Sequence, residues 1–135
     1  SSAVNASQFA KHVDFFSRGT NDLVQYALAI DRVNDEVNYL YDPFNSAVLQ
    51  LIHNVIKAGK KYNIPVSLCG AMAGDVSFTR LLLGMGLQSF SMHPSAIPEI
   101  KKIILNSDTN KFHSIIKRIL NNDSKKKELI DKINS

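Results

Sequence analysis

Three short polar clusters contain the side chains of this chain that are best suited to chemistry. They are Thr20-Asn21-Asp22, Cys69-Gly70 and Met92-His93. Each cluster directly follows a brief apolar stretch that is typical of a β-strand. In parallel α/β folds, functional groups gather at the carboxyl ends of the strands. The sequence therefore predicts that the three clusters meet at one edge of a sheet.

The first cluster offers ligands for an anion and for a cation. Asp22 places a carboxylate beside the glycine-containing turn 18–22, and a hard cation such as Mg²⁺ needs few protein carboxylates. The side-chain amide of Asn21 can donate a hydrogen bond to a bound anion. Both residues are also typical helix caps, and the residues alone favour that structural interpretation.

Three further residues each allow a functional and a structural interpretation. The guanidinium of Arg32 suits a phosphate or a carboxylate, but it could equally pair with Asp31 or Asp35 on the surface. Cys69 could be a reactive thiol or a proton donor, or only a small hydrophobic residue at a strand end. A single histidine such as His93 is more often structural. With one cysteine and scattered histidines, we expect no zinc site.

The elements expected to position these clusters alternate between strand and helix. Strands are expected at 14–17, 64–69 and 87–92, and helices at 2–13, 23–30, 47–62, 77–85, 95–105, 110–120 and 124–133. A polar connection is expected at 31–45. This alternation predicts an α/β fold with a parallel sheet and right-handed crossovers. The brief apolar strands are typical of parallel strands that are buried on both faces.

Length and composition limit the class of protein. The chain has 135 residues, 44% of them hydrophobic and 21% charged, which predicts one ordinary domain. It is too short for a complete β/α barrel of about 250 residues. No apolar run approaches the ~20 residues of a membrane span, and residues 1–7 do not resemble a signal peptide. The single cysteine excludes an internal disulfide and predicts a cytoplasmic protein.

Positive charge is concentrated near the C-terminus. Residues 101–135 contain nine Lys or Arg and four Asp or Glu, whereas residues 1–100 contain seven and eight. A basic tail can bind nucleic acid. This one has a single arginine and a single aromatic residue, Phe112, so we interpret it as a solvated helical face and expect no nucleic-acid partner.

Several motifs follow one another in the order of a known family. They are DFFSRGTNDL (14–23), QY (25–26), AIDR (29–32), LCG (68–70), MAGD (72–75), LLGMGL (82–87) and FSM (90–92). Together they resemble enzyme I of the bacterial sugar phosphotransferase system, or its nitrogen-related paralogue, the phosphoenolpyruvate-protein phosphotransferases. A series of motifs is a more specific signal than one short pattern. Pyruvate phosphate dikinases and phosphoenolpyruvate synthases share the cysteine loop, but they usually have His where Met72 stands.

The resemblance implies a fold and an activity. In that family a dimeric β/α (TIM-like) barrel binds phosphoenolpyruvate, and the phosphoryl group passes to a histidine of an N-terminal domain and then to a histidine-containing phosphocarrier protein. The chain, which lacks an initial Met, is then expected to be the C-terminal fragment of such a barrel. It would have about three βα units within the family match at 1–105 and a helical tail at 106–135. We expect this fragment to be inactive alone.

The resemblance also implies roles for matching residues. Asn21 and Asp22 would contact phosphoenolpyruvate, and Asp22 would also bind Mg²⁺. Arg32 would hold the substrate. Cys69 would be the general acid that protonates the enolate of pyruvate. These roles suit the chemistry, because phosphoryl transfer depends on positioning and charge neutralisation and a protonated thiol can supply a proton to carbon.

Two positions depart from the family pattern. The family usually has Glu after the Cys-Gly pair, where this chain has Ala71, and an apolar residue where it has Arg18. The first change suits an alternative function, a non-catalytic module that binds phosphoenolpyruvate or a protein partner. A partial barrel also leaves a strand edge to be covered. We expect a two-fold homodimer to cover it, and the alternative is that helices 110–120 and 124–133 cap the sheet.

Overall fold

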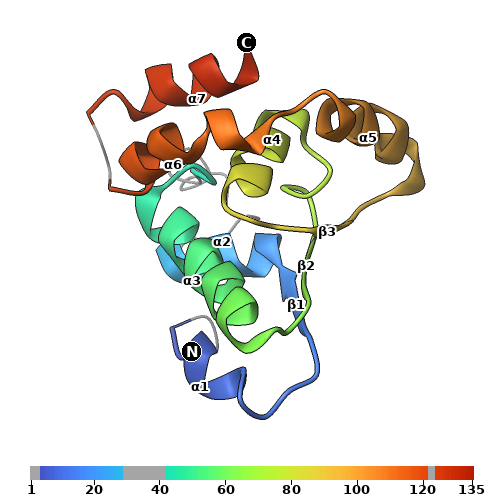
Figure 1. The fold of residues 1–135 in the computed structure, drawn as a ribbon, viewed down its shortest axis with the longest axis vertical. Coiled ribbons are helices and arrows are strands. Elements are labelled where there is room, and N and C mark those ends of the chain that lie inside the picture. Colours follow the sequence, from blue (N-terminus) through green and yellow to red (C-terminus); the bar gives the residue numbers. More distant parts are fainter. Residues whose placement is uncertain (1–3, 29–41, 122–123) are drawn as a thin grey trace.

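The computed structural model describes residues 4–28, 42–121 and 124–135, without the side chains of Asp22, Gln25 and Tyr26. In these residues, helices surround a small sheet (Figure 1). In chain order the elements are α1 (Ala6–Phe9), β1 (Phe16–Gly19), α2 (Thr20–Leu28), α3 (Ser46–Tyr62), β2 (Val66–Cys69), α4 (Val76–Gly84), β3 (Ser89–Ser91), the 3₁₀ turn η2 (Pro94–Ala96), α5 (Ile97–Leu105), the 3₁₀ turn η3 (Thr109–Lys111), α6 (His113–Leu120) and α7 (Lys126–Asn134).

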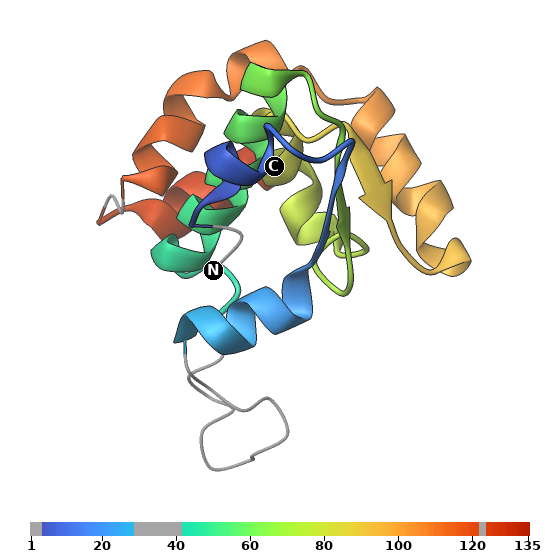
Figure 2. The ribbon, with the colours of Figure 1, turned by 90° about the horizontal axis from the view of Figure 1, so that it is seen from below.

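The three strands form one parallel sheet in the order β1-β2-β3. A helix follows each strand, so the predicted α/β alternation and the parallel sheet are confirmed. In both ribbon views the strands lie between α3 and α5 (Figures 1 and 2). The carboxyl ends of all three strands therefore lie at the same edge of the sheet.

The two faces of the sheet differ in chemistry. Successive residues of a strand point to opposite faces, and the register aligns the strands in rows. One face has small and polar residues: Ser17, Gly19, Ser67, Cys69, Ser89 and Ser91. The other face has Phe16, Arg18, Val66, Leu68 and Phe90, and its four apolar members belong to or pack against the core. The expectation that the strands are buried on both faces is wrong, because the polar face is largely open to solvent.

Helix α3 is the longest described helix and contributes most to the core. Its buried residues recur every three or four positions: Val48, Leu49, Ile52, Val55, Ile56, Ala58 and Gly59. The side chain of Asn45 caps its first turn by accepting a hydrogen bond of 2.9 Å from the amide of Ala47. Asn63 ends the helix in the left-handed conformation. The helix packs against β2, α1, α2 and α6.

The basic C-terminal tail folds into two helices, as predicted. Helix α6 packs against α3 and α4, and α7 packs against α4 and α6. Figure 1 shows α6 beside α4 and α7 beyond both, at the far end of the molecule from α1. The suggestion that the tail caps the sheet is therefore wrong, because the tail packs on other helices.

Several predicted boundaries differ from the structure; α1, for example, covers only Ala6–Phe9 of the helix predicted at 2–13. The first strand begins two residues later than predicted, since Asp14 and Phe15 are exposed and unpaired with β2. The predicted turn 18–22 is divided between the end of β1 and the start of α2. The predicted connection 31–45 lies mostly outside the described residues. Among the helices that are described, none is long and apolar enough to cross a membrane.

Candidate functional site

The first two polar clusters are joined by hydrogen bonds at the carboxyl edge of the sheet. The hydroxyl of Thr20, which is 1% exposed, donates to the carbonyl oxygen of Cys69 at 3.1 Å. The amide of Ala71 donates to Oδ1 of Asn21 at 3.4 Å. The thiol of Cys69 donates to the carbonyl oxygen of Arg18 at 3.3 Å. The end of β2 is thus fixed against the junction between β1 and α2.

Gly70 makes this close approach possible. Its φ is +104°, a conformation that side chains disfavour. A Cβ atom there would lie 2.8 Å from Oγ1 of Thr20 and 3.5 Å from Oδ1 of Asn21. Any larger residue would therefore push α2 away from the end of β2.

The third cluster shares a pocket of about 480 Å³ with Cys69. The residues that line it come from the ends of β2 and β3 and the loops that follow them: Cys69, Gly70, Ala71, Gly74, Ser91, Met92, His93 and Ala96. Cys69 is a free, partly buried cysteine. All three clusters therefore lie along one edge, with a thiol at a solvent-accessible pocket.

His93 has a structural role at this pocket. Its Nδ1 accepts a hydrogen bond of 3.2 Å from the amide of Ser95 and lies 2.8 Å from the hydroxyl of the same residue. His93 is therefore the N-cap of η2. The structural interpretation is confirmed. Because a backbone amide can only donate, we assign the proton of the neutral ring to Nε2.

A second pocket of about 170 Å³ adjoins the first and contains an acidic residue that the sequence analysis missed. It is lined by Thr20, Asn21, Val24, Pro43, Ala71, Met72, Asp75 and Phe78. The carboxylate of Asp75 accepts hydrogen bonds from the amide and hydroxyl of Ser77, at 2.9 and 2.7 Å. It caps α4, and its place before an apolar helical run was the available signal. Ala71 lines both pockets.

The donor atoms at this edge suit a hard cation. Asn21 and Asp75, whose side chains carry oxygen atoms, line one pocket, and Mg²⁺ needs only one or two carboxylates when substrate and water supply the other oxygens. Across the described residues there is no group of three or more His, Cys, Asp or Glu that could hold a metal alone. The side chain of Asp22 and all of Arg32 lie outside the described residues.

Residues 1–109 match the family of PEP-utilising enzymes, in their PEP-binding domain. The chain belongs to this family. The matched residues include all three strands and all three polar clusters. The match to the PEP-binding domain family thus accounts for the order of motifs that suggested the resemblance.

Three curated relatives that the chain resembles have the same name. The chain is 47% identical over 112 residues to a "Phosphoenolpyruvate-protein phosphotransferase" of Cupriavidus necator, covering 83% of the chain and 19% of the relative. It is 45% identical over 127 residues to that of Latilactobacillus sakei, covering 94% and 22%. For that of Enterococcus faecalis the values are 48% over 118 residues, covering 87% and 20%. The chain spans about a fifth of the length of these relatives.

Proposed function

We propose that this chain forms part of the phosphoenolpyruvate site of a phosphoenolpyruvate-protein phosphotransferase. The observation that carries the proposal is the set of three polar clusters at one sheet edge, where Cys69 lines a pocket of about 480 Å³. Pockets of roughly 300–1,000 Å³ suit small ligands. The names of the curated relatives support the reaction class, in which phosphoenolpyruvate gives its phosphoryl group to a protein.

The polar residues beside α2 are proposed to bind the substrate. Asn21, whose amide lies against the end of β2, would contact the phosphate of phosphoenolpyruvate together with Asp22. Arg32 would hold the anionic substrate with its planar guanidinium. A bound Mg²⁺, for which Asp22 is the proposed ligand, would neutralise charge on the transferring phosphoryl group.

Cys69 is proposed to be the general acid. When the P–O bond of phosphoenolpyruvate breaks, the phosphoryl group passes to a protein histidine and the enolate of pyruvate remains. The enolate carbon then takes the thiol proton: the S–H bond breaks, a C–H bond forms, and the thiolate is reprotonated from water. The thiol donates a hydrogen bond to the carbonyl of Arg18 at 3.3 Å. This supports the role, because only the protonated thiol can donate such a bond and act as an acid.

The amphipathic sheet supports the proposal that these strands belong to a β/α barrel. In such barrels alternate residues of each strand face the interior, and helices cover the outside. Here the apolar face of the sheet packs on the core beneath the helices, and the opposite face exposes small polar residues beside Cys69. We propose that this polar face lines the interior of a dimeric barrel, and that a histidine-containing phosphocarrier protein receives the phosphoryl group.

Ala71 favours a second candidate function, a non-catalytic module. It is exposed and lines both pockets of the site. Its methyl group can neither ionise nor bind a cation, so the site would bind phosphoenolpyruvate without turnover. A third possibility, a pyruvate phosphate dikinase or phosphoenolpyruvate synthase, is less well supported, because the relatives reported above are phosphotransferases that act on a protein.

A chimaeric enzyme tests the proposed function. The matching segment of the Cupriavidus necator relative is replaced by these residues, and pyruvate formation is followed with phosphoenolpyruvate, Mg²⁺ and a phosphocarrier protein. Changing Cys69 to Ala should lower the rate by roughly 10²–10⁴, the usual contribution of a general acid, with phosphoenolpyruvate binding nearly unchanged. Ser114→Ala, on the exposed side of α6, is the control. The 135 residues alone should release no pyruvate above a blank without protein.

Two results would contradict this proposal. A chimaera with Cys69→Ala that works at the normal rate would remove the role of the thiol. An inactive chimaera that still binds phosphoenolpyruvate, and that gains activity on Ala71→Glu, would favour the non-catalytic module.

A further inference from the structure

Another pocket with polar lining residues lies away from the sheet edge, between α3 and α6. It has a volume of about 440 Å³. Its lining residues come from α3, the end of α4 and α6 with the residue that follows it: Gln50, His53, Asn54, Lys57, Gly84, His113, Ile116, Lys117, Leu120 and Asn121. It shares no lining residue with either pocket of the Cys69 site.

Two contacts hold the walls of this pocket at a defined distance. The side-chain amide of Gln50 donates a hydrogen bond of 2.5 Å to the carbonyl oxygen of Leu120, which ties α3 to the end of α6. At the floor, α4 and α6 approach so closely that a Cβ atom at Gly84 would lie 2.7 Å from Cγ1 of Ile116. The cavity is therefore part of the packed structure between helices.

The described titratable groups that line this pocket are basic. Helix α3 contributes His53 and Lys57, and α6 contributes His113 and Lys117. Each pair is four residues apart, so both members lie on one face of their helix. Among the residues that the structure describes, no Asp or Glu lines the pocket. Neither lysine forms an ion pair or a side-chain hydrogen bond with another described residue.

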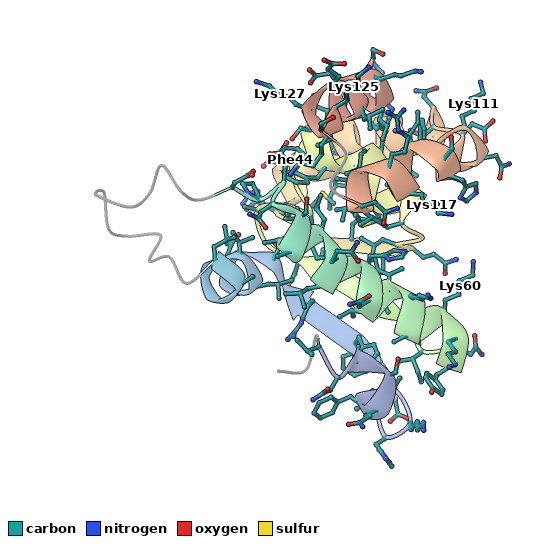
Figure 3. All side chains as sticks on the ribbon, turned by 90° about the vertical axis from the view of Figure 1, so that its left-hand side faces the viewer. Phe44, Lys60, Lys111, Lys117, Lys125 and Lys127 are labelled. Carbon is teal, nitrogen blue, oxygen red and sulfur yellow. The ribbon has the colours of Figure 1, made fainter. Side chains whose placement is uncertain are left out.

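The pKa of His53 shows that the pocket disfavours a further positive charge. Burial lowers the pKa of its imidazole below 6.5, and the positive charge of Lys57 lowers it further. Two lysines that converge on one half-enclosed space repel each other, and a bound anion would relieve this repulsion. In Figure 3, Lys117 on α6 and Lys60 on α3 extend to the same side of the molecule.

We propose that the pocket between α3 and α6 binds the phosphate group of a small phosphorylated metabolite. Lys57 and Lys117 would neutralise the phosphate charge, and the side-chain amides of Asn54 and Asn121 would donate hydrogen bonds to its oxygens. The volume leaves space for a small organic group beside the phosphate. This site is separate from the proposed phosphoenolpyruvate site and does not depend on it.

Solution NMR of the 135-residue chain tests this binding directly. Inorganic phosphate and glycerol 3-phosphate are titrated in turn against a chloride solution of the same ionic strength. We expect saturable shifts of the resonances of His53 and His113, and a pKa of His53 that is higher with phosphate present. The double variant Lys57→Gln/Lys117→Gln should bind about tenfold more weakly or worse, because two charge-assisted contacts are lost.

A matched variant keeps this test independent of net charge. Lys101→Gln/Lys102→Gln removes the same charge from exposed positions on α5 and should bind phosphate as the unchanged chain does. Equal weakening by both double variants, or shifts that chloride reproduces, would overturn the proposal. So would an acidic peptide that saturates these shifts while phosphate does not, since the occupant would then be a protein.

Discussion

Thr20 and Cys69, 49 residues apart in the sequence, are joined by a hydrogen bond of 3.1 Å from Oγ1 of Thr20 to the carbonyl oxygen of Cys69. This bond connects the first residue of α2 to the last residue of β2. Because Thr20 is almost fully buried, water cannot easily replace either partner. The position of Asn21 beside Ala71 depends on this contact, since Asn21 follows Thr20 directly.

Thr20→Val should therefore destabilise the chain. Valine has nearly the same shape, but it leaves the partly buried carbonyl of Cys69 without the hydroxyl donor of Thr20. We expect the free energy of unfolding to fall by about 1–3 kcal/mol, the usual cost of an unsatisfied buried polar group. Urea denaturation followed by circular dichroism measures it. Thr20→Ser keeps the hydroxyl and should lose less, and a valine variant as stable as the serine variant would contradict the role of the bond.

Gly70→Ala should destabilise the same junction for a different reason. The positive φ of Gly70 costs a residue with a side chain about 1–2 kcal/mol, and the added methyl group would lie 2.8 Å from the hydroxyl of Thr20. Gly74→Ala is the control, because its Cβ would meet the nearest atom at 3.4 Å and its φ is not positive. Thermal unfolding compares the two variants. Equal midpoints would show that the junction tolerates the methyl group.

The sequence predicted the order of elements well, because strands and helices are encoded locally by apolar periodicity and caps. It failed for the faces of the sheet. A run such as Val66 to Cys69 is apolar enough to suggest burial on both sides, and only the register shows that Ser67 and Cys69 share a face with the serines of β1 and β3. That information comes from pairing between distant segments.

The candidate site was predicted in outline and missed in detail. Placement of Cys69 and His93 at the ends of neighbouring strands followed from the rule for parallel sheets, and a shared pocket agrees with it. Asp75 was missed because the sequence can indicate that a residue caps a helix but not which pocket that residue lines. The basic pocket was missed as well, since α3 and α6 come together only through tertiary packing. Asp22 and Arg32 remain predictions.

The stability of the chain should depend on pH through His53. Its pKa in the folded state is lowered, by burial first and by Lys57 second, so the unfolded chain takes up a proton at higher pH than the folded chain does. Stability that is present above the ordinary pKa of about 6.5 is therefore lost as the pH falls toward the folded-state value. Urea denaturation in buffers without phosphate should show this loss.

His53→Gln is the informative variant for this effect. It should flatten the pH dependence between 6.5 and the lower folded-state pKa, because glutamine does not titrate. His12→Gln, at an exposed position, is the control and should leave the slope as it is. A His53→Gln chain with the slope of the unchanged protein would mean that another group is responsible.

The edges of the sheet lead to a prediction about assembly. Strands β1 and β3 each pair on one side only among the described residues, and unpaired strand edges are normally covered. The tail helices do not cover them, because they pack on α3 and α4. Within the described part of the chain, three of the six exposed large hydrophobic residues, Val4, Phe9 and Phe15, precede β1. We therefore expect a two-fold dimer that buries this region and the edge of β1.

Light scattering after size exclusion, at high micromolar concentration, measures the mass of this assembly. Phe15 is 67% exposed beside the start of β1, so Phe15→Ser should raise the dissociation constant of the dimer by about tenfold or more through loss of buried apolar area. Leu105→Ser removes an equally exposed side chain from the end of α5, away from β1, and should leave the dimer intact. A monomer mass for the unchanged chain would show that β1 needs no partner subunit, and equal weakening by both variants would place the interface elsewhere.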